Sequence, residues 1–70
     1  MRLVVNGQER ESPAADLAEL WRIETEPLEV DGPEGFAIAL NGSVVRRAAW
    51  AATMLSEGDR VEIILAMQGG

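Results

Sequence analysis

Two Asn-Gly dipeptides constrain the fold of this chain more than any other feature. Asn6-Gly7 follows a β-rich run at 1–5, and Asn41-Gly42 follows a second such run at 36–40. An Asn-Gly pair favours the type I′ turn of a two-residue β-hairpin, because both of its positions need a positive φ. The sequence therefore predicts two hairpins, with return strands at 8–11 and 43–46. No internal repeat links the hairpins, so turn chemistry alone relates them.

A helix is expected between the two hairpins. Ser12-Pro13 matches an N-cap followed by proline at the first helical position. The apolar residues that follow recur at helical spacing on one face: Ala14, Leu17, Ala18, Leu20 and Trp21. The helix should end before Pro27, because the residue that precedes a proline resists the α conformation.

The rest of the chain supplies a loop, a turn and one more strand. The acidic stretch 24–34 reads as a solvated loop; a calcium site is the alternative, although the spacing does not match an EF-hand. A short helical turn is expected at 47–54 and a final strand at 60–66. The helix must then pack across one face of a mixed sheet in which the first and last strands are parallel central neighbours. This is an α+β fold with the β-grasp arrangement.

Side chains alternate between the two faces of a strand, and this alternation separates a core face from an outer face. The bulky set should face the helix: Leu3, Val5, Phe36, Ile38, Leu40, Val61, Ile63 and Leu65. The opposite set is also apolar and should form one contiguous patch for partner docking: Val4, Ala37, Ala39, Ile64 and Ala66. The alternative is that small apolar residues on a sheet surface need no functional explanation.

Composition excludes several classes of function. The 70 residues contain no cysteine, histidine, lysine or tyrosine, and all six basic residues are arginine. We therefore expect no metal site and no bound cofactor, and the lack of the usual nucleophiles argues against a self-contained enzyme. A net charge of −6 repels nucleic acid and anionic membranes. With no signal peptide or membrane-spanning stretch in the sequence, we expect a soluble, cytoplasmic protein. Arg46-Arg47, a lone basic pair, could grip a carboxylate or phosphate, or simply meet neighbouring surface carboxylates.

The chain ends in Gly69-Gly70, directly after an apolar strand. Glycine lets the backbone approach another surface closely, so such a tip could enter a narrow enzyme channel and present its carboxylate for activation. We accordingly divide the chain into a folded domain at 1–66 and a flexible tail at 67–70. The alternative is a frayed terminus with no role.

Several segments together carry a family resemblance. They are residues 3–7, 16–20, 37–42, 45–51, 57–63 and 68–70, and they include both Asn-Gly turns, Arg47-x-x-Trp50 and the Gly-Gly ending. With these segments the chain resembles the ThiS family, ubiquitin-like β-grasp sulfur carrier proteins of thiamine biosynthesis, over essentially its full length. It departs from the family at Arg46, where proline is common, and in a longer acidic loop before Phe36.

The resemblance implies a carrier that other enzymes act on. An E1-like adenylating enzyme would use ATP to convert the Gly70 carboxylate to an acyl-adenylate. A persulfide from a donor such as cysteine desulfurase would then leave a thiocarboxylate, and thiazole synthase would receive the sulfur. Gly69 would give the tail clearance, Met67 and Gln68 would position it, and Ile64 with the alanine face would dock the partner.

Other functions stay open from the sequence. The chain could carry sulfur for molybdopterin synthesis or for tRNA thiolation, since those carriers share the fold and the Gly-Gly. It could be a β-grasp interaction module in which the Gly-Gly is incidental. A small carboxylate-based enzyme around Asp16 and Glu19 is a third class, and it would require turnover by the isolated chain.

Overall fold

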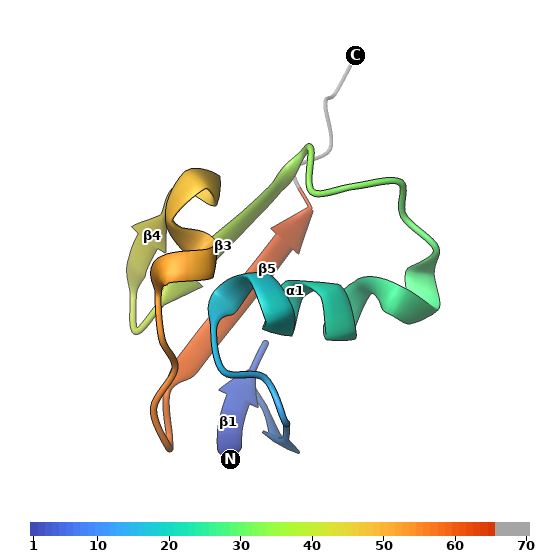
Figure 1. Cartoon of the computed structure of the whole chain (residues 1–70). Helices are drawn as coiled ribbons and strands as arrows, with labels where there is room; N and C mark the ends of the chain where they lie inside the picture. The colour runs from blue at the N-terminus through green and yellow to red at the C-terminus, as the bar shows by residue number, and fades with distance from the viewer. Residues whose placement is uncertain (66–70) are drawn as a thin grey trace.

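The computed structural model describes residues 1–65, which form a five-stranded mixed sheet with one main helix. The elements are β1 Arg2–Val5, β2 Gln8–Glu11, α1 Leu17–Thr25, the 3₁₀ helix η1 Glu26–Leu28, β3 Phe36–Leu40, β4 Ser43–Val45, the 3₁₀ helix η2 Arg47–Ala52 and β5 Arg60–Leu65. Helix α1 lies across one face of the sheet (Figure 1). Within the described residues, no helix is long and apolar enough to cross a membrane.

The last strand occupies the centre of the sheet. The strand order is β2-β1-β5-β3-β4. β5 runs parallel to β1, with Val5 opposite Val61, and antiparallel to β3, with Ile38 opposite Ile63. The predicted α+β fold of the β-grasp type is confirmed, including the parallel pairing of the first and last strands.

Both hairpin turns adopt the predicted left-handed conformation. Asn6 has φ 52° and Gly7 has φ 81°, while Asn41 has φ 52° and Gly42 has φ 88°. Asparagine and glycine tolerate this region better than other residues, which is why these two dipeptides specify the turns.

The two asparagine side chains also hold β5, so turn chemistry is not their sole common role. The backbone N–H of Asn6 donates to the Val61 carbonyl at 2.9 Å, and its side-chain Oδ1 accepts from the Ile63 N–H at 2.8 Å. On the other side of β5, the Asn41 N–H donates to the Arg60 carbonyl at 2.7 Å, and Asn41 Oδ1 accepts from the Arg60 N–H at 2.9 Å. At both hairpins the strand beside β5 has turned away, so it offers no further backbone carbonyl to β5. The asparagine Oδ1 accepts the β5 N–H in place of that carbonyl.

The predicted helix start is wrong. α1 begins at Leu17 and is capped by Asp16, whose carboxylate accepts from the Glu19 N–H at 2.8 Å. Glu19 in turn accepts from the Ala15 N–H at 2.7 Å, which resembles a capping box shifted by one residue. Ser12 Oγ instead accepts from the Ala14 N–H at 3.2 Å and closes a local turn. The helix ends at Thr25, before Pro27, as predicted.

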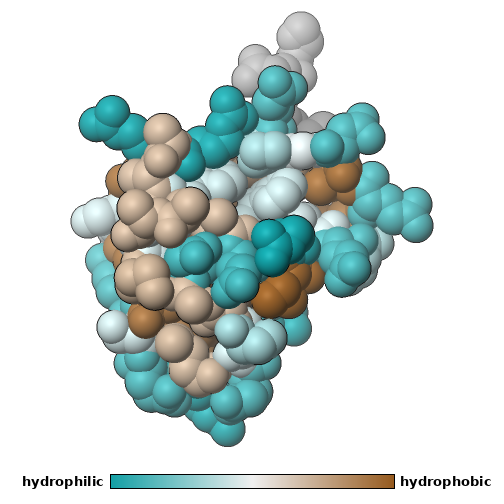
Figure 2. All heavy atoms as spheres, viewed as in Figure 1, coloured by the Kyte–Doolittle hydropathy of each residue, from teal (hydrophilic) through white to brown (hydrophobic). Residues whose placement is uncertain are grey.

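The core lies between α1 and the sheet. Its buried side chains come mainly from the predicted inner set and the helix: Leu3, Val5, Ala14, Leu17, Leu20, Ile38, Trp50, Leu55 and Val61. The register confirms the face of two residues whose exposure differs from expectation. Leu65 is on the inner face but 48% exposed, because it lies at the end of β5, and Ala39 is on the outer face but only 9% exposed. Seen from the helix side, moderately apolar side chains gather over η2 at the left of the molecule (Figure 2).

The two tryptophans have different polar environments. Trp50 is 3% exposed, and its indole N–H donates to the Val45 carbonyl at 2.8 Å. Trp21 packs edge-on against Phe36, with ring centroids 5.4 Å apart, and its centroid lies 6.2 Å from that of Trp50. The buried Trp21 indole N–H has no acceptor within residues 1–65.

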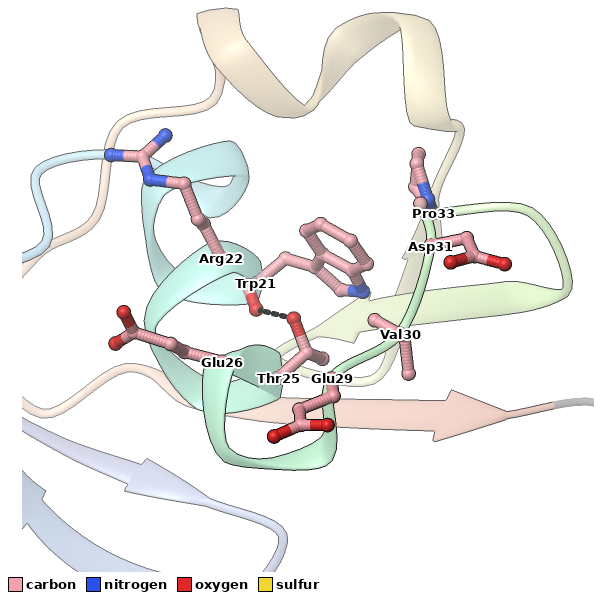
Figure 3. A pocket seen from close by; sticks show the side chains of 9 residues that line it. Trp21, Arg22, Thr25, Glu26, Glu29, Val30, Asp31 and Pro33 are labelled. Atoms are coloured by element: carbon pink, nitrogen blue, oxygen red, sulfur yellow. Dashed lines mark hydrogen bonds between the residues drawn. The ribbon is translucent and has the colours of Figure 1, made fainter.

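A cavity of about 460 Å³ adjoins Trp21 at the C-terminal end of α1. Figure 3 shows the indole lying between the helix and the loop that carries Val30, Asp31 and Pro33, with the Thr25 hydroxyl bonded to the Trp21 carbonyl. The acidic stretch therefore wraps around the helix end, and it contains the 3₁₀ helix η1 in addition to loop. Across the described part of the chain, no three acidic side chains come together as a metal site would need.

Replacing each turn asparagine with glycine tests the bonds to β5. Glycine keeps the positive φ but removes the side-chain acceptor, so Asn6→Gly and Asn41→Gly should each destabilise the fold by about 1 kcal/mol. Urea unfolding measures this loss. Amide hydrogen exchange should accelerate most at Ile63 in the first variant and at Arg60 in the second. Each variant is the control for the other, and unchanged stability with unchanged exchange would contradict the assignment.

Phenylalanine substitutions at the two tryptophans separate packing from hydrogen bonding. Both changes replace an indole with a phenyl ring, but only Trp50→Phe breaks a hydrogen bond, the one that the Val45 carbonyl accepts, and Trp50 is also the more buried of the two. Trp50→Phe should therefore be more destabilising than Trp21→Phe by about 1 kcal/mol in urea unfolding. Equal losses, or a larger loss at Trp21, would show that the indole bond of Trp50 adds nothing.

Candidate functional site

The outer face of the sheet carries an apolar patch on its β3–β4 side. Ile64 on β5 lies opposite Ala37 on β3, and Ala39 lies opposite Val44 on β4. We call these four residues, Ala37, Ala39, Val44 and Ile64, the outer-face patch. Ile64 is 51% exposed and Val44 is 78% exposed, so two large apolar side chains meet solvent on a small acidic protein. Such exposure is typical of a contact surface.

Val44 was absent from the predicted docking set. The sequence could have shown that Val44 belongs to the outer face. Val44 pairs with Ala39 in the second hairpin, and paired residues on neighbouring strands point to the same face of the sheet. The predicted docking set omitted Val44 because the return strand 43–46 was assigned no surface of its own.

Val4, which was predicted to belong to the same patch, lies apart from it. Its neighbours across the strands are Arg60 on β5 and Glu9 on β2. Glu62, the next outward residue of β5, separates Val4 further from Ile64. The expectation of one contiguous patch is therefore wrong for Val4. Ala66, the remaining predicted docking residue, lies outside the described residues.

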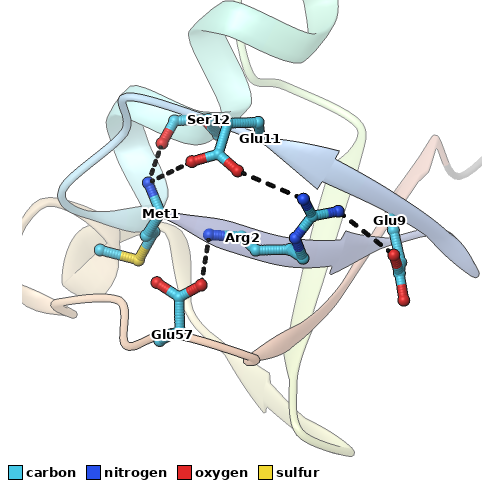
Figure 4. A network of polar contacts seen from close by, with 6 residues as sticks. All are labelled: Met1, Arg2, Glu9, Glu11, Ser12 and Glu57. Atoms are coloured by element: carbon cyan, nitrogen blue, oxygen red, sulfur yellow. Dashed lines mark hydrogen bonds and ion pairs between the residues drawn. The ribbon is translucent and has the colours of Figure 1, made fainter.

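The β1–β2 side of the same face is polar and internally paired. Arg2 contacts Glu9 at 3.3 Å and Glu11 at 3.8 Å. The Met1 ammonium group donates to the Ser12 carbonyl at 2.8 Å and lies 3.4 Å from Glu11 (Figure 4). Glu57 accepts from the backbone N–H of Arg2 at 2.9 Å. One side of the outer face thus satisfies its own charges, while the other presents apolar surface.

The outer-face patch is continuous with the strand that leads to the chain end. Ile64 belongs to β5, which is bonded on both sides, and the described residues end at Leu65. The predicted tail positions Met67, Gln68, Gly69 and Gly70 lie outside the described residues. Among the site residues predicted from the sequence, the structure brings together Ala37, Ala39 and Ile64.

Asp16 and Glu19 have structural roles. Both carboxylates accept backbone N–H groups at the start of α1, which accounts for their position without any chemistry. Arg46 directly precedes η2 and Arg47 is its first residue, and within residues 1–65 neither forms an ion pair. The suggestion that this pair meets neighbouring carboxylates is therefore not supported by the described part of the chain.

Comparison with known proteins identifies the relatives of this chain. A family model described as the ThiS family matches residues 3–70. The crystal structure of a thiamine biosynthesis protein (ThiS) from Geobacter metallireducens is 36% identical, with a TM-score of 0.74, and the alignment covers 100% of both chains. A solution NMR structure of a thiamine biosynthesis protein from the same organism is also 36% identical, with a TM-score of 0.71 and coverage of 100% of this chain and 88% of that one.

No curated protein matches the chain significantly. The family model nevertheless matches residues 3–70. The structural match covers the whole chain, with 36% of the residues identical. This chain belongs to the ThiS family.

Proposed function

We propose that this protein is a sulfur carrier that holds sulfur as a thiocarboxylate on Gly70 and donates it for the thiazole ring of thiamine. The observation that carries the proposal is the ThiS family match, which extends through Gly69 to Gly70. Family membership supports a small carrier rather than an enzyme. The 36% identity to a protein named for thiamine biosynthesis favours thiamine among the possible sulfur acceptors.

The proposed chemistry begins with activation of the carboxylate. A Gly70 oxygen attacks the α-phosphorus of ATP on an E1-like enzyme, the bond to the β-phosphate oxygen breaks, and pyrophosphate leaves. The acyl-adenylate then has AMP as a good leaving group. The terminal sulfur of a persulfide displaces AMP, and a thiol reductant cleaves the resulting S–S bond to release the Gly70 thiocarboxylate. Thiazole synthase then takes the sulfur.

The composition of the chain suits this sequence of steps. An acyl-adenylate reacts with any nearby amine or thiol, and the chain has neither cysteine nor lysine. The Met1 ammonium group is held by the Ser12 carbonyl and Glu11 at the start of β1. Because β5 runs parallel to β1, Leu65 lies at the opposite end of the sheet. The activated carbonyl would therefore meet few competing groups of the carrier itself.

The outer-face patch is the proposed docking surface for the adenylating enzyme and for thiazole synthase. Its apolar side chains would bury against the partner while the tail, proposed to comprise residues 67–70, enters the partner's channel. Gly69 would allow close approach there, with Met67 and Gln68 setting the reach of Gly70. The catalytic groups, the ATP and the persulfide, which a cysteine desulfurase would form, belong to the partners.

A thiocarboxylate gel tests the chemistry directly. The protein is incubated with an E1-like enzyme from its own organism, ATP and a persulfide source, then run on an organomercury gel, which retards thiocarboxylates. We expect an ATP-dependent retarded band that disappears when Gly70 is deleted. Gly70→Ala should fold normally and give the band more slowly, since a Cβ must enter the channel. No band, with an enzyme shown to be active on another carrier, would contradict the proposal.

A pair of matched surface substitutions tests the docking surface. Ile64→Gln removes an exposed apolar side chain from the outer-face patch, and Leu28→Gln does so on η1, where Leu28 is 63% exposed. Ile64→Gln should raise the KM of the adenylating enzyme for the carrier by about tenfold, because about 1.4 kcal/mol of apolar contact is lost. Leu28→Gln should leave KM unchanged. Equal effects of the two variants would remove the patch from the interface.

A further inference from the structure

A second surface lies on the helix side of the sheet, in the groove between α1 and η2. Its volume is about 300 Å³. We call it the tryptophan groove, and its lining residues come from α1, the 30–33 loop and η2: Ala18, Trp21, Arg22, Pro33, Arg47, Trp50 and Ala51. The floor and walls are aromatic and small apolar side chains, and one arginine stands on each of the two helices.

The apolar surface continues beyond the groove. Ala48, Ala51 and Ala52 on η2 are exposed, and Met54, which follows η2, is 64% exposed. Figure 2 shows a continuous area of moderately apolar side chains over η2, with polar side chains beside it. Alanine side chains let another backbone approach closely, so this area suits contact with an extended segment of a partner.

Two arginines that form no ion pair within residues 1–65 line the groove. Arg2 pairs with Glu9 and Glu11, and Arg10 pairs with Glu24 at 3.3 Å. Arg22 and Arg47 have no carboxylate partner in residues 1–65, as is also true of Arg46 and Arg60, although the chain has twice as many acidic as basic residues, 12 against 6. What sets Arg22 and Arg47 apart is that both line the groove beside the two tryptophans. Two unpaired guanidinium groups beside an aromatic floor match a carboxylate that lies next to an apolar side chain.

We propose that the tryptophan groove docks an acidic segment of a partner protein, with an aliphatic side chain on the tryptophans and its neighbouring carboxylates on Arg22 and Arg47. This inference does not depend on the sulfur chemistry. The groove and the outer-face patch lie on opposite faces of the sheet, so the docked segment leaves the patch accessible. A carrier of this form holds one partner by its helix side while another reaches the strand that leads to Gly70.

The probe is a hexapeptide, acetyl-Glu-Asp-Leu-Leu-Asp-Glu-amide, titrated into the ¹⁵N-labelled full chain. Its uncharged counterpart, acetyl-Gln-Asn-Leu-Leu-Asn-Gln-amide, is the matched peptide. The chain has two tryptophans, so the two indole N–H signals report the groove without crowding. We expect both indole signals and the amides of Ala18 and Ala51 to shift with the acidic peptide, and the uncharged peptide to bind at least about tenfold more weakly.

Arginine variants separate the groove from general charge attraction. Arg22→Gln and Arg47→Gln should each weaken the acidic peptide about tenfold, because each removes a charge-assisted contact. Arg46→Gln removes the same charge from the residue before η2, which does not line the groove, and should change affinity less than about twofold.

Four results would overturn the proposal. The first is that no groove signal shifts at peptide concentrations up to about 2 mM, and the second is that the uncharged peptide binds as tightly as the acidic one. The third is that Arg46→Gln weakens peptide binding as much as Arg22→Gln or Arg47→Gln. The fourth is that inorganic phosphate shifts the groove signals as much as the acidic peptide does. The last would make the groove a phosphate site instead. If the peptide does not bind but the thiocarboxylate band is normal, only the groove proposal is contradicted. If the peptide binds but no band forms, only the proposed sulfur chemistry is contradicted.

Discussion

Two asparagine side chains extend the backbone pairing that holds β5 at the centre of the sheet. β1 and β3 both turn away from β5 at their Asn-Gly hairpins, and at each departure an Oδ1 atom accepts the next N–H of β5. Asn41 is fixed in turn by Asp59, which accepts from its Nδ2 at 3.1 Å. A domain of 70 residues buries a limited core, so a bond worth about 1 kcal/mol is a sizeable part of its stability. The turn residues thereby fix the strand that leads toward Gly70.

The two faces of the sheet differ because the helices cover only one of them. The helix and η2 bury one face around Leu17, Leu20 and Trp50, which leaves the outer face without cover. On the β1–β2 side of that face, Arg2 forms ion pairs with Glu9 and Glu11, so these charges already have partners within the chain. The exposed large apolar side chains of that face, Val44 and Ile64, are on the β3–β4 side and at the end of β5. A partner docked on the apolar side, as proposed above, would lie next to β5, the strand that precedes residues 66–70 in the sequence.

The sequence predicted the fold because its signals were local and agreed with one another. The Asn-Gly turns, the apolar stripe at 14–21 and the alternation of 36–40 and 60–66 together leave few topologies. Predictions failed where two local signals competed. Ser12-Pro13 and Asp16 are both plausible helix starts, and Asp16 is the cap because Glu19 completes its backbone bonds while Ser12 serves a turn. Val4 was grouped with Ile64 because alternation gives the face of a residue but not its neighbours across the sheet, and only the register shows Arg60 and Glu62 between them.

The tryptophan groove was beyond the reach of sequence reasoning for a related reason. Trp21 and Trp50 come from segments separated by a loop and a hairpin, and nothing in their spacing predicts that their rings lie 6.2 Å apart. Arg22 and Arg47 likewise become a pair only when α1 and η2 pack together. Acidic side chains outnumber basic ones in this chain, so arginines left unpaired within residues 1–65 retain their full attraction for an external carboxylate. The same packing that buries Trp50 thus creates, on the face opposite the outer-face patch, a concave surface whose charge is opposite to that of the chain as a whole.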